Sequence, residues 1–63
     1  MNLPYFVVKM SVNRQFYWVL KAGNGEVVAV SETYTTKQSA KRSIELIKDL
    51  APRATVVDQA VAV

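Results

Sequence analysis

The most restrictive feature of this chain is that its 63 residues include neither cysteine nor histidine. A monomer of this length buries only about 60% of the surface that its unfolded chain exposes, so its fold is marginal. Natural domains this small commonly gain stability from disulfides, from a bound metal or from association with another chain. Disulfides and the common zinc sites need residues that this sequence lacks. We therefore expect a single domain over residues 1–63 that gains further burial from a second copy.

The same absence restricts the chemistry that the chain can perform. Ser-His-Asp and Cys-His hydrolases are excluded, and we predict no metal site, no cofactor and no catalytic residues. Glu45 and Asp49 are one helical turn apart, but lysines flank them on a face that we expect to be exposed rather than in a cleft. The sequence therefore predicts a protein that is not an enzyme, with a site at the seam between two copies as the remaining alternative.

Composition gives little indication of a partner. Eight Lys or Arg residues against five Asp or Glu give a net charge of +3, which is too small to indicate nucleic acid by itself. The sequence has no signal-peptide pattern and no apolar run near the roughly 20 residues of a membrane-spanning helix. We therefore expect a cytoplasmic protein without a membrane partner.

Three short runs rich in β-branched and aromatic residues predict an antiparallel meander. The strands are expected at residues 5–10, 15–22 and 26–31, and the third is apolar on both faces, which leaves its register open. Asn24-Gly25 between the last two strands predicts a type I′ hairpin turn, which needs positive φ at both residues. The large apolar side chains that alternate along the second strand, and so predict its core face, are Phe16, Trp18 and Leu20.

A single amphipathic helix is predicted over residues 37–50. Thr36 is a suitable N-cap, Pro52 ends the helix, and Lys41 and Glu45 are spaced for an i,i+4 ion pair. The side chains that gather on the arc expected to cover the sheet are Ala40, Ser43, Ile44, Leu46, Ile47, Leu50 and Ala51. The helix should therefore lie along one face of the sheet.

The last segment, residues 54–63, is rich in valine and reads as a fourth strand. Left unpaired it would favour aggregation, so we expect it to join a sheet. It can extend the meander of its own chain, or it can add to the sheet of a second copy, which also supplies burial. We favour the second arrangement. The predicted fold is α+β with the order β-β-β-α-β, as a homodimer that exchanges its C-terminal strands.

Residues 6–52 resemble the YegP-like family of small uncharacterised bacterial proteins. The resemblance is carried by LKAGNGE at 20–26, SETYTTK at 31–37, Ser39-Ala40 and Ile44. It implies β-β-β-α-β units that pair, in tandem or between chains, into one sheet with exchanged C-terminal strands. A chain with one unit would be of the pairing kind. The resemblance implies no activity, and Ser43, where family members commonly have glycine, implies a slightly different spacing between helix and sheet.

The connection before the helix carries one candidate ligand site. Side chains in such a loop can point at a ligand, and the start of a helix favours anions. The members of this candidate site are Ser31, Glu32, Tyr34 and Lys37. The same residues also fit a structural role at the sheet edge, which we favour.

A second candidate is a nucleic-acid surface that combines an aromatic ring with a basic helix face. Its members are Tyr17, Lys37, Lys41 and Lys48. A solvated helix face is the favoured alternative for the lysines, and core packing is favoured for the neighbouring Phe16 and Trp18. Gly23-Asn24-Gly25 is better explained as a hairpin than as a phosphate-binding loop.

Together these patterns predict a small, non-catalytic binding or interaction module of the bacterial cytoplasm. Its expected partners are a second copy of itself and an unidentified protein or small ligand. Nucleic-acid binding through the basic helix face is the alternative function, and an enzyme with its site at the dimer seam is the third.

Overall fold

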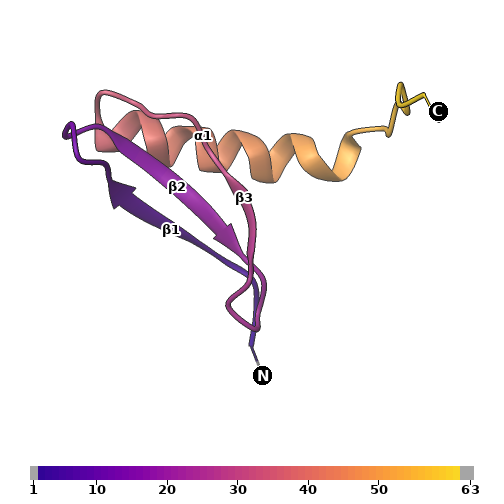
Figure 1. Ribbon diagram of the computed structural model, residues 1–63, viewed down its shortest axis with the longest axis horizontal. Helices are drawn as coiled ribbons and strands as arrows, with labels where there is room; N and C mark the ends of the chain where they lie inside the picture. Colours follow the sequence, from indigo (N-terminus) through magenta and orange to yellow (C-terminus); the bar gives the residue numbers. More distant parts are fainter. Residues whose placement is uncertain (1, 62–63) are drawn as a thin grey trace.

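A computed structural model describes residues 2–61 of the chain and shows an α+β fold (Figure 1). A three-stranded antiparallel sheet in the order β1-β2-β3 carries one helix on one of its faces. Its elements are β1 (Tyr5–Met10), β2 (Phe16–Lys21), β3 (Val27–Val30), α1 (Lys37–Leu50) and a short 3-10 turn η1 (Ala51–Arg53). The bounds of β1 and α1 coincide with the predicted ranges, and β2 and β3 are each one residue shorter at both ends.

The two hairpin loops have the same backbone hydrogen bonds. In the first, the amide of Ser11 donates to the carbonyl of Gln15 (2.7 Å) and the amide of Arg14 donates to that of Ser11 (3.0 Å). In the second, Ala22 donates to Glu26 (2.8 Å) and Gly25 donates to Ala22 (2.9 Å). The residue before the closing position has positive φ in both loops, 64° at Arg14 and 89° at Gly25. Each is therefore a three-residue loop whose last residue is left-handed.

This geometry corrects the type I′ turn predicted for Asn24-Gly25. Gly25 has positive φ but Asn24 does not, because the loop closes between Ala22 and Glu26 and contains three residues rather than two. The side chain of Asn24 instead accepts a hydrogen bond from the Glu26 amide at 3.0 Å. The pairing of β2 with β3 also shifts register between Leu20 and Lys21, as it does at a β-bulge.

The core lies between β2 and the first half of α1. Trp18 is 6% exposed, and its ring meets that of Phe6 edge to face, with centroids 5.2 Å apart. From the helix, Ala40 and Ile44 are buried against this face. Phe16 and Leu20 share the face and are half-buried. The predicted core face of β2 is therefore the one that α1 covers.

The second half of α1 extends beyond the sheet (Figure 1). Of the apolar arc predicted to cover the sheet, only Ala40 and Ile44 are buried. Leu46, Ile47 and Leu50 remain 55%, 36% and 46% exposed. The periodicity correctly aligned these side chains, but the strands are too short to lie beneath the whole helix.

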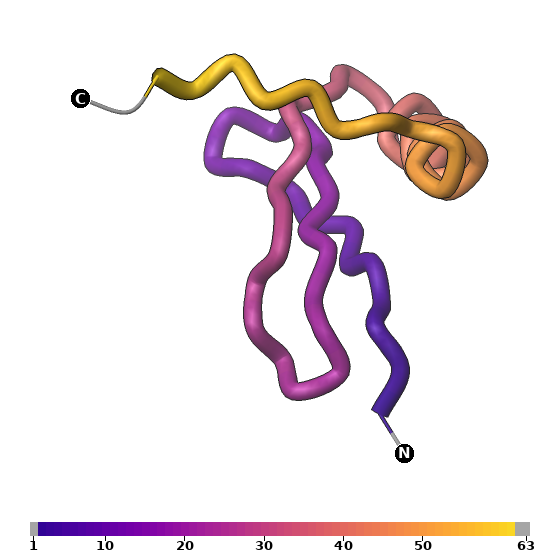
Figure 2. Tube along the Cα trace, turned by 90° about the vertical axis from the view of Figure 1, so that its right-hand side faces the viewer, coloured from indigo at the N-terminus to yellow at the C-terminus, as the bar shows by residue number. Residues whose placement is uncertain are grey.

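Residues 54–61 follow η1 as an exposed tail that forms no strand with its own chain. Figure 1 shows this tail continuing past the end of α1, beyond the sheet, and Figure 2, which looks along the helix, shows the yellow tail leaving the helix sideways. Val56, Val57 and Val61 are 94%, 74% and 84% exposed. The predicted fourth strand is therefore not formed within the single chain, and its last two positions, 62–63, lie outside the described residues.

Candidate functional site

The hydroxyl of Ser31 is occupied by the backbone around it. It accepts a hydrogen bond from the Trp18 amide at 2.9 Å and donates one to the Glu32 carbonyl at 2.7 Å. The Ser31 amide also donates to the Trp18 carbonyl at 3.0 Å. These bonds hold the end of β3 against β2, so the hydroxyl has a structural role in this structure.

Tyr34 continues this attachment along β2. Its carbonyl accepts from the Phe16 amide at 2.7 Å, and its amide donates to the Phe16 carbonyl at 2.6 Å. Its side chain is half-buried, whereas Glu32 and Lys37 are exposed. Within residues 2–61, no hydrogen bond or ion pair joins the side chains of the first candidate set. The structure therefore places Ser31, Glu32, Tyr34 and Lys37 along one connection without drawing them together around a common point.

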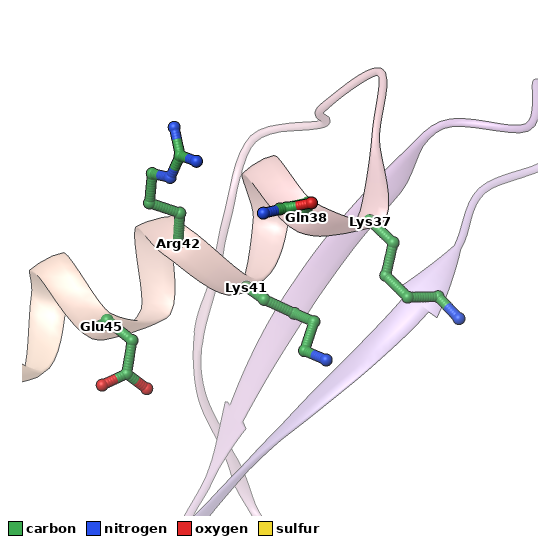
Figure 3. Close-up of a pocket in the computed structure, with 5 residues that line it drawn as sticks. All are labelled: Lys37, Gln38, Lys41, Arg42 and Glu45. Carbon is green, nitrogen blue, oxygen red and sulfur yellow. The ribbon is translucent and has the colours of Figure 1, made fainter.

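The first two turns of α1 carry a basic cluster around an open surface hollow of about 650 Å³ (Figure 3). Five residues line this hollow: Lys37, Gln38, Lys41, Arg42 and Glu45. In Figure 3 the side chains of Lys37 and Lys41 extend to one side of the helix and that of Arg42 to the other. All of these side chains belong to α1 and point outward from it. A ligand in the hollow would therefore be contacted from one side only.

The basic side chains on and just after α1 fall into two groups, those with an ion pair and those without one. Glu45 lies 3.9 Å from the Lys48 ammonium, in place of the predicted pair with Lys41, and Asp49 lies 2.8 Å from the Arg53 guanidinium. Over the described range 2–61, Lys41 has no ion pair, and neither do Lys37 and Arg42. The uncompensated positive charge is therefore at the start of the helix, away from Lys48.

Tyr17 lies on the other side of the sheet from these lysines. Trp18 points toward α1, since its indole donates to Ser43 at 2.7 Å, and successive strand residues point to opposite faces. The second candidate set therefore does not form one continuous surface. The cation next to Tyr17 is Lys9, its partner across β1 and β2.

Two further residues, Tyr5 and Lys21, share this side of the sheet with Tyr17 and Lys9. The register pairs Tyr5 with Lys21, at the opposite end of the same two strands. Alternation along the second strand already places Lys21 on the side of Tyr17, and an antiparallel alignment of the two predicted strands would have added Tyr5. We name this side, opposite α1, the open face; from β1 and β2 it carries Tyr5, Val7, Lys9, Tyr17, Val19 and Lys21.

Neither a metal cluster nor a membrane span is found in the part of the chain that the structure describes. In residues 2–61, no group of three or more His, Cys, Asp or Glu side chains is placed to hold a metal ion. No helix in the same range is long and apolar enough to cross a bilayer.

Comparison with known proteins gives a consistent result. Residues 11–58 match the domain of unknown function DUF1508. The UPF0339 protein YegP of Escherichia coli is 43% identical over 49 residues, which cover 78% of this chain and 44% of that protein. A UPF0339 protein of Treponema denticola is 42% identical over 53 residues, covering 84% of this chain and 91% of that protein.

A solved structure has the same fold. The solution structure of a protein from Haloferax volcanii superposes with a TM-score of 0.82 at 37% identity, covering 92% of this chain and 98% of that one. The chain spans less than half the length of several curated relatives, including 46% of one from Photorhabdus laumondii. The resemblance carried by its hairpin and helix-entry motifs is confirmed, and the chain belongs to the YegP-like DUF1508 family, whose function is unknown.

Proposed function

We propose that this chain acts as a non-catalytic binding module made of two copies, in which residues 54–61 of each copy complete the sheet of the other. The observation that carries the proposal is the exposure of the valine-rich tail, where Val56 is 94% exposed and Val57 74%. A β-branched segment with free backbone groups is a template for strand pairing. A second copy offers strand edges for that pairing without requiring the tail to turn back from the end of α1.

The dimensions of the single chain support the same arrangement. Its radius of gyration is 14.1 Å, whereas a compact chain of this length has about 10.6 Å. Its accessible surface is 5439 Å², which is about 1,400 Å² more than area scaling gives for a compact protein of this mass. A standard interface buries about 800 Å² per partner. The excess area is therefore large enough to supply a stable dimer interface.

The apolar half of α1 gives the partner a second surface to cover. Leu46, Ile47 and Leu50 extend the stripe that Ala40 and Ile44 begin, and they are exposed where the sheet ends. A partner sheet that lies beside this one would run beneath that half of the helix. Tail exchange and helix coverage would then bury the two exposed apolar regions in one event.

The proposal that the module is non-catalytic rests on where its acids lie. Glu45 and Asp49 are exposed on α1 and are paired with Lys48 and Arg53. Perturbed acids and bases in a cleft are the usual mark of a catalytic site, whereas both of these carboxylates are exposed and Glu45 borders only the open hollow on α1. Binding through a surface that the dimer presents is the simpler function for such a unit.

The test is the molar mass in solution, measured by light scattering coupled to gel filtration. We expect twice the chain mass of 7.0 kDa. Replacing both Val56 and Val57 with Glu should shift the species to the monomer, because charges cannot enter the paired strand. Gln59→Glu, which adds charge to the same exposed segment at a polar position, is the matched control. A monomeric natural chain, or a dimer that both variants leave unchanged, would contradict the exchange.

A further inference from the structure

The open face carries an ordered arrangement of aromatic and basic side chains. The register of β1 and β2 pairs Tyr5 with Lys21 at one end and Lys9 with Tyr17 at the other, with Val7 opposite Val19 between them. Paired residues point to the same side of a sheet. A central valine pair is therefore flanked at each end by one tyrosine and one lysine, in opposite order on the two strands.

The middle of this face is closed while its ends remain accessible. Val19 is only 5% exposed although α1 lies on the other side, and its partners across the sheet are Val7 and Val30. Tyr5 is 45% exposed, and Lys9 is exposed. Tyr17 and Lys21 are half-buried. A ligand would therefore meet a closely packed apolar centre with a partly accessible ring and cation at each end.

All charged residues of the three strands are basic. The strands β1, β2 and β3 contain no acidic residue, and their only charged residues are Lys9 and Lys21. Both lysines are on the open face, each beside a tyrosine. A surface that combines partly exposed rings with cations and lacks carboxylates is complementary to a ligand that has flat rings and negative charges.

We infer that the open face binds single-stranded nucleic acid, with bases stacked on Tyr17 and Tyr5 and phosphates at Lys9 and Lys21. Tyr5 is four residues along β1 from Lys9, the partner of Tyr17, so the two rings are about 13 Å apart along the strands. They would therefore take two different bases of one extended strand. Stacking of this kind needs bases that are free of a duplex, which favours a single strand over double-stranded nucleic acid.

A protein ligand fits the same face less well. The cores of protein interfaces are depleted in lysine, and here a lysine lies directly across from each tyrosine. The inference also does not depend on the proposed dimer, because every residue of the face belongs to one chain. Strands added at the edge of the sheet extend it in its own plane and leave this face uncovered.

The experiment measures fluorescence anisotropy of a labelled single-stranded oligonucleotide of about 12 nucleotides at low salt. The full chain should bind it, and bind the matching duplex more weakly. Tyr17→Leu keeps the apolar bulk but removes the aromatic ring, and it should weaken binding about 5-fold to 150-fold, the loss of one stacked base. Tyr17→Phe keeps the ring and should bind as the natural chain does. Tyr5→Leu should behave like Tyr17→Leu.

The contribution of Lys9 and Lys21 is measured separately, through the dependence of the binding affinity on salt concentration. Lys9→Gln and Lys21→Gln should each lower the slope of log affinity against log salt by about 0.7. Lys48→Gln removes the same charge from α1, on the other side of the sheet, and is the control. Amide spectra of each variant establish that it is folded.

Three results would overturn the inference. The first is the absence of binding at low salt by the folded natural chain. The second is a loss of affinity in Lys37→Glu with none in Tyr17→Leu, which would assign the site to the helix. The third is chemical shift changes on the open face with a protein fraction but not with oligonucleotide, which would make it a protein-docking surface. A monomeric mass would overturn the proposed dimer and leave this inference standing.

Discussion

The indole nitrogen of Trp18 donates a hydrogen bond to the hydroxyl of Ser43 at 2.7 Å, and that hydroxyl donates to the Ala40 carbonyl at 2.7 Å. Among residues 2–61, no other side-chain hydrogen bond joins a strand to α1. Ser43 stands at a position where the resemblance to the YegP-like family implies glycine. The structure gives this serine a role, since it provides an acceptor for the indole of Trp18, which is only 6% exposed.

Ser43→Ala is predicted to destabilise the fold by about 1–2 kcal/mol, because the Trp18 indole loses its acceptor in a partly buried position. The measurement is urea unfolding followed by tryptophan fluorescence at fixed protein concentration. Gln38→Ala, at an exposed position of the same helix, is the control and should change stability by less than about 0.5 kcal/mol. Equal effects of the two substitutions would show that the hydrogen bond contributes nothing measurable.

The two hairpin loops predict opposite effects of glycine. Arg14 has φ 64° at the position where the other loop has Gly25, so Arg14→Gly should relieve backbone strain and stabilise the fold by up to about 1 kcal/mol. Gly25→Ala should destabilise it by about 1 kcal/mol for the converse reason. Thermal unfolding measures both.

Arg14→Gln separates the backbone effect from the loss of charge, since it removes the guanidinium but keeps a side chain at the left-handed position. It should leave stability nearly unchanged. If Arg14→Gln stabilised the chain as much as Arg14→Gly, charge rather than φ would be the cause.

Local sequence patterns predicted the helix and the three strands that form, but not how these elements meet one another. The helix bounds and the Thr36 cap, whose hydroxyl accepts from the Ser39 amide at 3.0 Å, follow from neighbouring residues alone. The Asn24-Gly25 turn did not, because the strand register decides whether a loop has two or three residues. Burial of Leu50 was wrongly predicted for the same kind of reason, since periodicity aligns side chains but says nothing about how far the sheet reaches.

The candidate sites also differ in how far the sequence alone could predict them. The sequence favoured a structural role for the polar residues of the connection over a ligand site, but it could not show that the Ser31 hydroxyl accepts a hydrogen bond from the Trp18 amide. In contrast, the separation of Tyr17 from Lys41 follows from alternation alone once Trp18 is assigned to the helix side. The pairing of Tyr17 with Lys9 then needed only the register of two predicted strands.

Deletion of residues 56–63 is predicted to remove both association and cooperative folding, because it takes away the segment proposed to complete the partner's sheet. Circular dichroism during heating should show no sharp transition, and gel filtration should show an expanded monomer. The natural chain at the same concentration is the reference. A truncated chain that unfolds cooperatively as a compact monomer would contradict the proposed exchange.

The apolar overhang of α1 gives a prediction that depends on the dimer and not on the single-chain fold. Ile47 and Leu50 are 36% and 46% exposed, so Glu at both positions should change the stability of a monomer only slightly. In the proposed dimer the same positions lie against the partner, and buried unpaired charges there should weaken association at least tenfold.

Sedimentation equilibrium over a range of concentrations measures the dimer dissociation constant. Val12→Glu, at a fully exposed hairpin position, is the control and should leave that constant unchanged. Similar constants for the helix variant and the control would mean that the partner does not cover this half of α1, and the interface would then be confined to the tail.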